Sequence, residues 1–230
     1  MKVGILGSGF AAKALGKGFA DRGHDVKMGT RSPEKLQEWL QGQGAKGKLS
    51  TGSFADAAKH GEVVVLALLG TGTEPALEMA GVANFDGKLV LDATNPLDFS
   101  QGMPPGLFVG TSDSLGERVQ RKLPRAKVVK CFNTVGNGQM VDPAFDGGPV
   151  PMLVAGNDAA AKERTEQILK ELGWPGAMDV GGIDGARWLE ALVPLWVRAM
   201  MQMNTFGHTF KPVGPAPSKG IGGPMPRGGA

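Results

Sequence analysis

The chain has 230 residues, of which 41% are hydrophobic and 20% are charged, and its formal net charge is +3. This length suits one well-packed α/β domain with a small appendage and excludes two full catalytic domains, while the ordinary composition excludes disorder over most of the chain. The positive charges form no dense block of lysine and arginine interleaved with aromatic residues, so we expect no nucleic-acid partner.

Cys131 is the only cysteine, which excludes an internal disulfide and a multi-cysteine metal site and agrees with a reducing compartment. The sequence passes from Met1 directly into a strand pattern, without the layout of a signal peptide. It also contains no apolar run long enough to span a bilayer. We therefore expect a soluble, cytoplasmic protein with no membrane partner.

Short apolar runs alternate with amphipathic stretches along most of the chain. The runs that predict buried strands are residues 2–6, 25–28, 62–68, 88–92, 127–131, 150–155 and 178–180. Helix patterns cover residues 10–22, 33–41, 53–59, 114–122 and 159–172, and several of them begin at a Ser or Asp capping signal. This alternation predicts an α/β fold of the Rossmann type, with a doubly wound, mainly parallel sheet covered by helices on both faces.

A long helix is predicted over residues 184–204, after the last strand. Its large apolar side chains share one face, and they are Trp188, Leu192, Leu195, Trp196, Ala199 and Met203. Packing of this face on the sheet is the favoured interpretation, and a dimer interface is the alternative. We expect residues 1–182 to form the Rossmann domain and residues 183–211 a small helical extension on the same core. The Gly/Pro-rich tail, residues 212–230, has too little apolar material to offset the entropy of ordering and is expected to be flexible.

A glycine-rich turn follows the first predicted strand directly and opens the first helix. Its sequence is Gly7-Ser8-Gly9-Phe10-Ala11-Ala12, the G-x-G-x-x-A form of the dinucleotide-binding fingerprint. In this pattern Gly7 allows the tight turn, Gly9 leaves room for a pyrophosphate and Ala12 lets the helix pack closely on the sheet. Free N–H groups at the helix N-terminus then bind the phosphates.

The end of the second predicted strand indicates which dinucleotide binds. NAD-binding domains usually carry an acidic residue there to bind the ribose hydroxyls, whereas this chain has Thr30-Arg31-Ser32 and, one helical turn later, Lys35. Two hydroxyls and two cations suit the 2′-phosphate of NADP, which arginine can bind through two hydrogen bonds. The alternative is that Ser32 caps the helix beginning at Pro33 and that the two cations are simply solvated, but the missing acid favours NADP.

Groups that could donate a proton to a carbonyl substrate are scarce. The chain has no tyrosine, and helix 184–204 has no lysine, so the acids of two common classes of Rossmann dehydrogenase are missing. His24 and His60 are interpreted as solvated loop residues away from the cofactor, whereas His208 remains an open candidate. No His/Cys/Asp/Glu spacing resembles a metal site. Hydride transfer to a flavin or deazaflavin ring needs no such acid, because the ring nitrogens exchange protons with water.

Several stretches together resemble the coenzyme F420-dependent NADP reductases and also the cytosolic NADPH-binding domain of the six-transmembrane metalloreductases. The most specific stretches are VVKCFNTVG from Val128 to Gly136 and VGGIDGARWLEALVPLW, which ends at Trp196. The others are residues 3–35, the LVLDATNP run that ends in Asn95-Pro96, and PMLVAGNDAAAKE. The resemblance covers most of residues 2–200. It implies a single Rossmann domain with a small C-terminal extension, usually dimeric, that passes a hydride between NADPH and F420.

The resemblance also implies positions for the ligand-binding residues. Residues Gly7, Ser8, Gly9, Phe10 and Ala11 would bind the pyrophosphate, Thr30, Arg31, Ser32 and Lys35 the 2′-phosphate, and Leu69 and Gly70 the nicotinamide side. Asn133, Thr134, Val135 and Gly136 would border the acceptor ring. Asn95-Pro96 and Asn133-Thr134 are also ordinary strand-to-loop turns, but ligands bind at the carboxyl ends of parallel strands, which favours a functional role.

The identity of the hydride acceptor stays open at this point. The metalloreductase relatives depend on a membrane half that has no counterpart in this sequence, so reduction of ferric or cupric ions through haem is not expected. F420, a free flavin or another small oxidant would each suit the chain as a small-molecule redox partner. We therefore expect an NADP(H)-dependent oxidoreductase with a deazaflavin or flavin-type acceptor. A non-enzymatic NADP(H)-binding redox sensor is the alternative.

Overall fold

The structure is a computed structural model that describes residues 1–45 and 47–214. Most of the predicted tail, from residue 215 to residue 230, lies outside the described residues. Within the described ranges, no helix combines the length and the apolar character that crossing a membrane requires.

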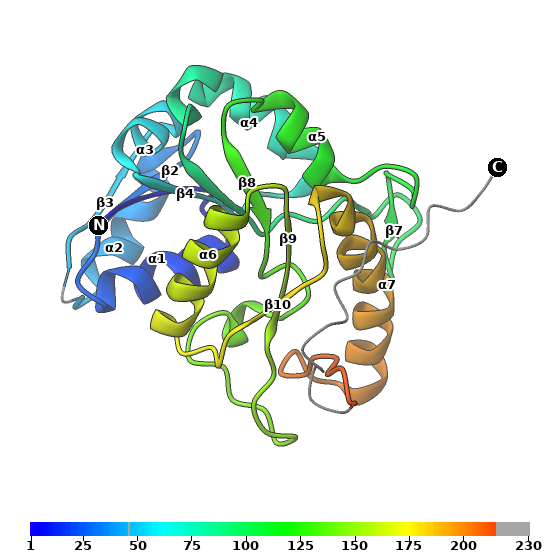
Figure 1. Ribbon diagram of the computed structural model, residues 1–230. Coiled ribbons are helices and arrows are strands. Elements are labelled where there is room, and N and C mark those ends of the chain that lie inside the picture. Colours follow the sequence, from blue (N-terminus) through cyan, green and yellow to red (C-terminus); the bar gives the residue numbers. More distant parts are fainter. Residues whose placement is uncertain (46, 215–230) are drawn as a thin grey trace.

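A single eight-stranded sheet forms the centre of the fold (Figure 1). Its strands lie in the order β10-β9-β8-β5-β4-β1-β2-β3, and every neighbouring pair is parallel except β8 and β9. Their bounds are β1 Lys2–Leu6, β2 Asp25–Gly29, β3 Leu49–Gly52, β4 Val63–Leu66, β5 Leu89–Asp92, β8 Lys127–Lys130, β9 Met152–Gly156 and β10 Ala177–Asp179. The predicted doubly wound, mainly parallel sheet is confirmed.

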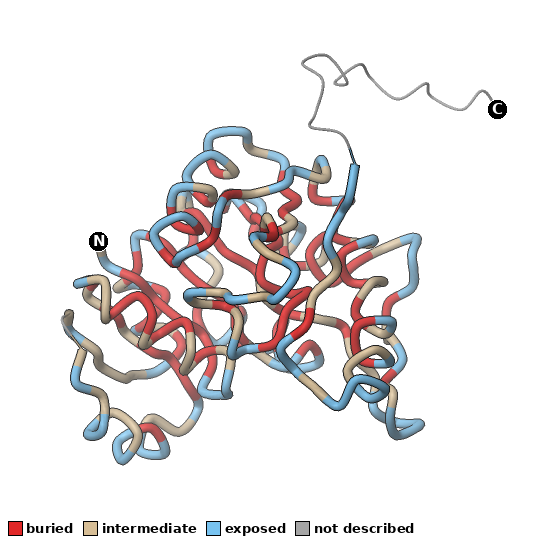
Figure 2. Tube along the Cα trace, turned by 90° about the horizontal axis from the view of Figure 1, so that it is seen from below, coloured by how far each residue is buried: buried red, intermediate tan, exposed pale blue. Residues whose placement is uncertain are grey.

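Helices cover both faces of this sheet, as Figure 1 shows. Helices α1 (Phe10–Asp21) and α6 (Ala159–Glu171) pack on one face, and α3 (Phe54–His60), α4 (Thr73–Ala80) and α5 (Leu115–Lys122) pack on the other. The sequence of strand β4 is continuously apolar because both faces of this strand are covered. Val63 and Val65 belong to one core cluster and Val64 and Leu66 to the other, because successive side chains of a strand point to opposite faces. The buried residues in Figure 2 follow these strands and the inner faces of the helices.

Side-chain caps begin three of the predicted helices. The Ser53 hydroxyl accepts a hydrogen bond from the backbone N–H of Asp56, and the Asp56 carboxylate accepts one from the backbone N–H of Ser53, which completes a capping box at α3. Ser114 caps α5 in the same way through the N–H of Glu117, and Asp158 caps α6. Each cap satisfies one of the N–H groups that a helix leaves unpaired at its start, so these boundaries could be predicted closely.

Two elements of the sheet layers were not predicted. Strand β3 has the sequence LSTG, with one large apolar side chain and no alternation, and it forms at the sheet edge through its backbone pairing with β2. Helix α4 follows a glycine-rich turn and carries Pro75 in its first turn, where a missing N–H removes no intrahelical bond. The predicted helix 33–41 is a 3₁₀ turn, η1 (Pro33–Leu36), followed by α2 (Gln37–Gln41).

The last helix, α7 (Ala186–Met203), turns a different face to the protein than the one we favoured. Its buried side chains include Leu189, Val193 and Val197, and the latter two pack with Leu97 of the hairpin formed by β6 (Leu97–Asp98) and β7 (Gly106–Leu107). Of the predicted stripe only Trp196 is buried, while Trp188, Leu195 and Met203 are 64%, 57% and 60% exposed. The favoured interpretation of the stripe as core is therefore wrong for most of its members.

Candidate cofactor-binding site

The glycine-rich turn lies between β1 and α1, as its sequence predicts. Gly7 has a φ of +138°, and a Cβ there would overlap the carbonyl oxygen of Ala67, so both its conformation and its surroundings require glycine. Gly9, in contrast, faces open space, since a Cβ at this position would meet no atom within 4 Å. Helix α1 begins at this open side without a side-chain cap or an acidic residue in its first turn. Its unpaired N–H groups therefore fit a bound anion such as a pyrophosphate.

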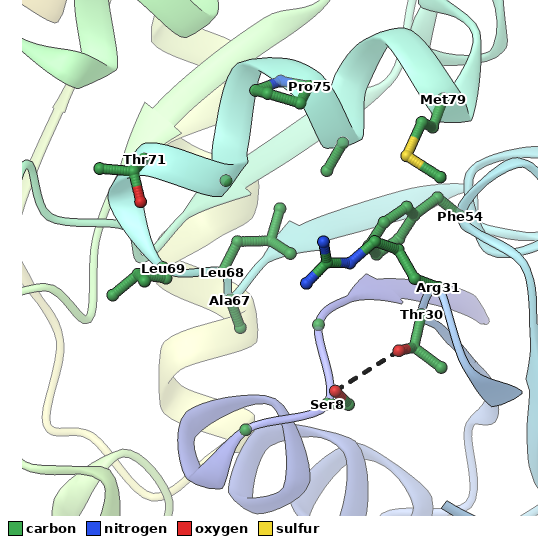
Figure 3. A pocket seen from close by; sticks show the side chains of 14 residues that line it. Ser8, Thr30, Arg31, Phe54, Ala67, Leu68, Leu69, Thr71, Pro75 and Met79 are labelled. Atoms are coloured by element: carbon green, nitrogen blue, oxygen red, sulfur yellow. Dashed lines mark hydrogen bonds between the residues drawn. The ribbon is translucent and has the colours of Figure 1, made fainter. Parts of the chain in front are cut away.

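A cavity of about 570 Å³ opens beside this turn (Figure 3). Ser8 and Thr30 point toward each other across its floor, with their hydroxyl oxygens 3.5 Å apart, and the Arg31 side chain extends into it. Ser32 and Lys35 do not line the cavity. The Ser32 side chain makes no capping hydrogen bond and Lys35 is exposed, so neither side chain is occupied by a structural role. Among the described residues, no carboxylate forms an ion pair with Arg31 or Lys35. The two cations remain available for a phosphate.

On the opposite wall of the cavity, the sequence analysis had named only Leu69 and missed the other lining residues. That wall is built from the end of β4, the turn after it and helix α4, with Phe54 of α3 beside them. Its lining side chains are mostly apolar, and they are Phe54, Ala67, Leu68, Leu69, Pro75, Ala76 and Met79. The position of residues 67–72 at the carboxyl end of a parallel strand was a usable signal for this wall. The short α4 pattern offered none.

A continuous line of contacts leads from this cavity toward α7. Leu69 lines the cavity and is 62% exposed, whereas Gly70 packs so closely on the next loop that a Cβ would overlap the carbonyl oxygen of Asn95. Asn95 Nδ2 in turn donates to the carbonyl oxygen of Asn133 at 2.9 Å, and Asn133 Nδ2 donates to Asn95 Oδ1 and to the carbonyl oxygen of Leu189, both at 3.0 Å. These bonds join the carboxyl ends of β5 and β8 to α7.

The loop after β8, which we expected to border the acceptor ring, is more buried than a ring-binding surface would be. Residues Asn133, Thr134, Val135 and Gly136 are all buried, and Val135 belongs to the main core cluster. Phe132, just before them, has a positive φ of 62°, which turns the chain sharply away from the strand. Phe10 is 79% exposed and its side chain lies outside the cavity, so this residue can offer the phosphate site only its backbone.

A fully buried ion cluster lies beneath the two asparagines, and sequence reasoning missed it as well. Lys130 Nζ lies 3.0 Å from Asp92 Oδ2 and 2.6 Å from Glu190 Oε1, and the three side chains are at most 2% exposed. Glu190 also accepts hydrogen bonds from the N–H groups of Leu115 and Gly116 at the start of α5. Burial alone would lower the pKa of Lys130, but the two carboxylates outweigh it and raise this pKa above its ordinary value. The signal for this cluster in the sequence was a charged residue within an otherwise apolar strand or helix, at positions 92, 130 and 190.

The histidines lie away from the cavity, but His24 and His60 are not the solvated residues we expected, because their side chains are only 11% and 15% exposed. His24 pairs with Glu171, and His60 pairs with Asp25, the first residue of β2. Both histidines therefore lie at the amino ends of the parallel strands, whereas the glycine-rich turn lies at their carboxyl ends. His208 packs against α7. Arg31 is the one titratable residue of the cavity lining that the structure describes. The 1–45 and 47–214 ranges hold no group of His, Cys, Asp and Glu residues that could bind a metal ion.

Comparison with known proteins gives relatives over nearly the whole chain. The family described as "NADP oxidoreductase coenzyme F420-dependent" matches residues 2–96. The F420-dependent NADP reductase of Methanocaldococcus jannaschii is 30% identical over 208 residues, which are 86% of this chain and 91% of that protein. A crystal structure from Arthrobacter sp. FB24, provisionally named an F420-dependent NADP reductase, is 41% identical, with a TM-score of 0.88 over 93% of this chain and 99% of that one. Metalloreductase STEAP3 of Rattus norvegicus is 26% identical, and the match spans 38% of its length.

Proposed function

The chain belongs to the family of F420-dependent NADP oxidoreductases and is an NADP(H)-dependent enzyme, and from this premise we propose that it transfers a hydride between NADPH and a deazaflavin or flavin-type acceptor. The observation that carries the proposal is the cavity beside Gly7 and Gly9, which combines an uncapped helix start with an unpaired arginine and an apolar wall. This combination suits a phosphorylated dinucleotide. NADPH supplies the hydride when it is bound.

The residues around the cavity would divide the binding of NADPH among them. Gly7, Ser8, Gly9 and the backbone N–H groups of Phe10 and Ala11 would hold the pyrophosphate, and Thr30 and Arg31, with Ser32 and Lys35 nearby, the 2′-phosphate. The apolar side chains of Phe54, Pro75 and Met79 would pack against the adenine ring. Leu69 and Gly70 would then direct the nicotinamide toward the ends of β5 and β8. Substrates bind at such positions in doubly wound sheets.

The enzyme's contribution to the chemistry would be positioning rather than proton transfer. Among residues 1–45 and 47–214, the lining of the cavity holds no carboxylate, histidine or lysine that could protonate a reacting oxygen. Two rings that meet face to face need only the correct distance and orientation for hydride transfer, and a deazaflavin or flavin exchanges its ring protons with water. The hydrogen bonds between Asn95 and Asn133 would fix the loops on which that orientation depends.

A direct turnover assay tests this proposal. The pure protein and NADPH are mixed with F420, FMN and FAD in turn, and the oxidation of NADPH is followed by absorbance. We expect turnover with F420 or with one of the flavins, and much slower turnover when NADH replaces NADPH. Tight NADPH binding without turnover with any acceptor would contradict the proposal and favour the redox-sensor alternative.

We also propose that the protein is a homodimer that pairs through the exposed side of α7. Trp188, Leu195 and Met203 recur there at helical spacing and are more than half exposed, and an apolar patch of this kind on a surface often marks an interface between proteins. Leu195→Glu should shift the mass measured by light scattering after gel filtration from dimer to monomer. Met178→Glu, at an exposed methionine of β10, is the matched control and should leave the mass unchanged. A wild-type monomer would contradict the proposal.

A further inference from the structure

After α7 the chain folds back and packs on the loop that follows β8. Residues 204–210, which we call the C-terminal turn, begin at Asn204 in the left-handed conformation, and the N–H of Thr205 caps the helix by donating to the carbonyl oxygen of Met200. The turn lies directly on Gly136, where a Cβ would overlap the carbonyl oxygen of Phe206. The predicted acceptor loop, residues 133–136, is therefore covered as long as this turn stays docked.

His208 holds the turn against α7, together with Phe206 and Phe210, which pack against the cluster around Trp196. The Nδ1 atom of His208 lies 3.1 Å from the carbonyl oxygen of Thr205, and its Nε2 lies 3.1 Å from the carbonyl oxygen of Trp196. The imidazole stacks on the Trp196 indole, with ring centroids 4.6 Å apart and planes 13° apart, and the indole Nε1 donates to the carbonyl oxygen of His208. His208 is 9% exposed, so neither ring nitrogen can readily turn to water instead.

Both polar partners of the imidazole are backbone carbonyl oxygens, so the hydrogen bonds depend on which ring nitrogens carry hydrogen. A backbone carbonyl oxygen only accepts hydrogen bonds, whereas a neutral imidazole carries one N–H and one lone pair. In the neutral form, one of the two contacts would place a lone pair against a carbonyl oxygen. Both contacts are hydrogen bonds only when both ring nitrogens carry hydrogen.

Charged groups on the surrounding elements have other partners or are exposed to solvent. On α7, Arg187 binds Glu117, Glu190 binds Lys130, and Arg198 is exposed. Lys211 donates to the carbonyl oxygen of Gly147, and Asp98 on the neighbouring hairpin accepts from the N–H of Ser100. No ion pair within the described part of the chain includes His208. The two carbonyl oxygens and the indole are thus its direct polar partners.

We propose that His208 is a proton-sensitive clamp that docks the C-terminal turn on the loop at Gly136 when both its ring nitrogens carry hydrogen. Loss of one proton breaks one of the two bonds and loosens the turn, which uncovers residues 133–136. Histidine is the side chain that most often changes its charge between about pH 5 and pH 8, so the tests compare the protein at the two sides of that range. The docking of the C-terminal turn does not depend on which reaction the enzyme catalyses. Its effect on the acceptor site rests on the function proposed above.

Nuclear magnetic resonance of the imidazole nitrogens tests the protonation directly, because the chain has only three histidines. With ¹⁵N-labelled histidine, His208 should show two N–H groups at about pH 5.5, and one of them should disappear toward about pH 8.5. His60→Gln and His208→Gln assign the signals. A single N–H on His208 throughout this range would overturn the proposal, whatever the variants do to stability.

Hydrogen–deuterium exchange tests the docking. At about pH 5.5 the amides of residues 132–140 should exchange about fivefold more slowly in the wild type than in His208→Gln, the effect of one lost hydrogen bond, and the two proteins should match at about pH 8.5. His60→Gln, a matched change at a histidine that contacts Asp25 instead, should behave as the wild type. Equal protection in all three proteins at both pH values would overturn the clamp. Neither readout uses turnover, so failure of the proposed function would leave both interpretable.

Discussion

Arg187 and Glu117 form a two-pronged ion pair that ties α7 to α5, with Nε–Oε2 and Nη2–Oε1 distances of 2.8 Å and 2.6 Å. The hydrogen bonds from Arg187 lower the pKa of Glu117 despite its burial, and Ser114 adds a further bond to the same carboxylate. A carboxyl group with a lowered pKa in the folded state stabilises the protein above its ordinary value of 4.5, and this stability is lost as the pH falls through the folded pKa.

We expect the free energy of unfolding to decrease as the pH falls below the ordinary pKa of Glu117. In the Glu117→Gln variant, part of this decrease should be missing. The variant should also lose about 1–3 kcal/mol at neutral pH, because the half-buried Arg187 and the buried Ser114 would keep only a neutral partner. Asp113→Asn is the comparison, since hydrogen bonds from Arg121 lower the pKa of Asp113 from 3.8 to about 2, and its contribution should be lost as the pH falls between these two values. Urea titrations between neutral and acidic pH measure both effects. A Glu117→Gln curve parallel to the wild type would contradict the assignment.

The two glycines of the phosphate loop should differ when each is replaced by alanine. Gly7→Ala should destabilise the folded protein, because its Cβ would overlap a backbone carbonyl oxygen at a positive φ. Gly9→Ala should leave the melting temperature nearly unchanged, since the added methyl meets open space, but should weaken NADPH binding by filling the phosphate site. Thermal unfolding and NADPH titration of both variants separate the two effects. If Gly9→Ala binds NADPH as the wild type does, the pyrophosphate lies elsewhere.

Arg31→Ala should weaken NADPH binding by about 1.5–3 kcal/mol and leave NADH binding almost unchanged, because the lost contacts are to the 2′-phosphate. Lys35→Ala is the control, and it should have a smaller effect because Lys35 does not line the cavity. Isothermal titration with both cofactors measures the difference. Equal losses for NADPH and NADH in Arg31→Ala would show that the guanidinium binds some other part of the cofactor.

Lys130→Met should destabilise the fold by about 3–5 kcal/mol, because it leaves the carboxylates of Asp92 and Glu190 buried without their counter-charge. Lys17→Met removes a lysine from the half-exposed pair with Asp21 and should cost less than about 1 kcal/mol. Denaturant unfolding of the two variants gives the comparison. Similar small losses would indicate that the buried cluster contributes no more than a surface pair.

The features that could be predicted from the sequence are those set by neighbouring residues. The strand–turn–helix around Gly7 and the caps at Ser53 and Ser114 depend on interactions within a few positions, and the structure contains them. Strand β3 depends on pairing with β2, so its own four residues carry almost no signal.

The features of the structure that the sequence did not show have a similar cause. Helix α7 carries apolar side chains on two faces, and periodicity alone does not decide which face meets the protein. The ion cluster unites residues 92, 130 and 190, which only the folded chain brings together. Val135 was expected beside the acceptor ring, yet the C-terminal turn and the core enclose its loop.

The close approaches at Gly7, Gly70 and Gly136 restrict how this sequence can diverge. Each glycine faces a backbone carbonyl oxygen, of Ala67, Asn95 and Phe206 respectively, and that oxygen is present whatever side chain its residue carries. No second-site suppressor at those three partners can therefore make room for a Cβ. Gly16 differs, since its nearest neighbour is the Met28 side chain, which a smaller residue could replace. In a random mutant library, compensated replacements should be recoverable at position 16 and absent at positions 7, 70 and 136.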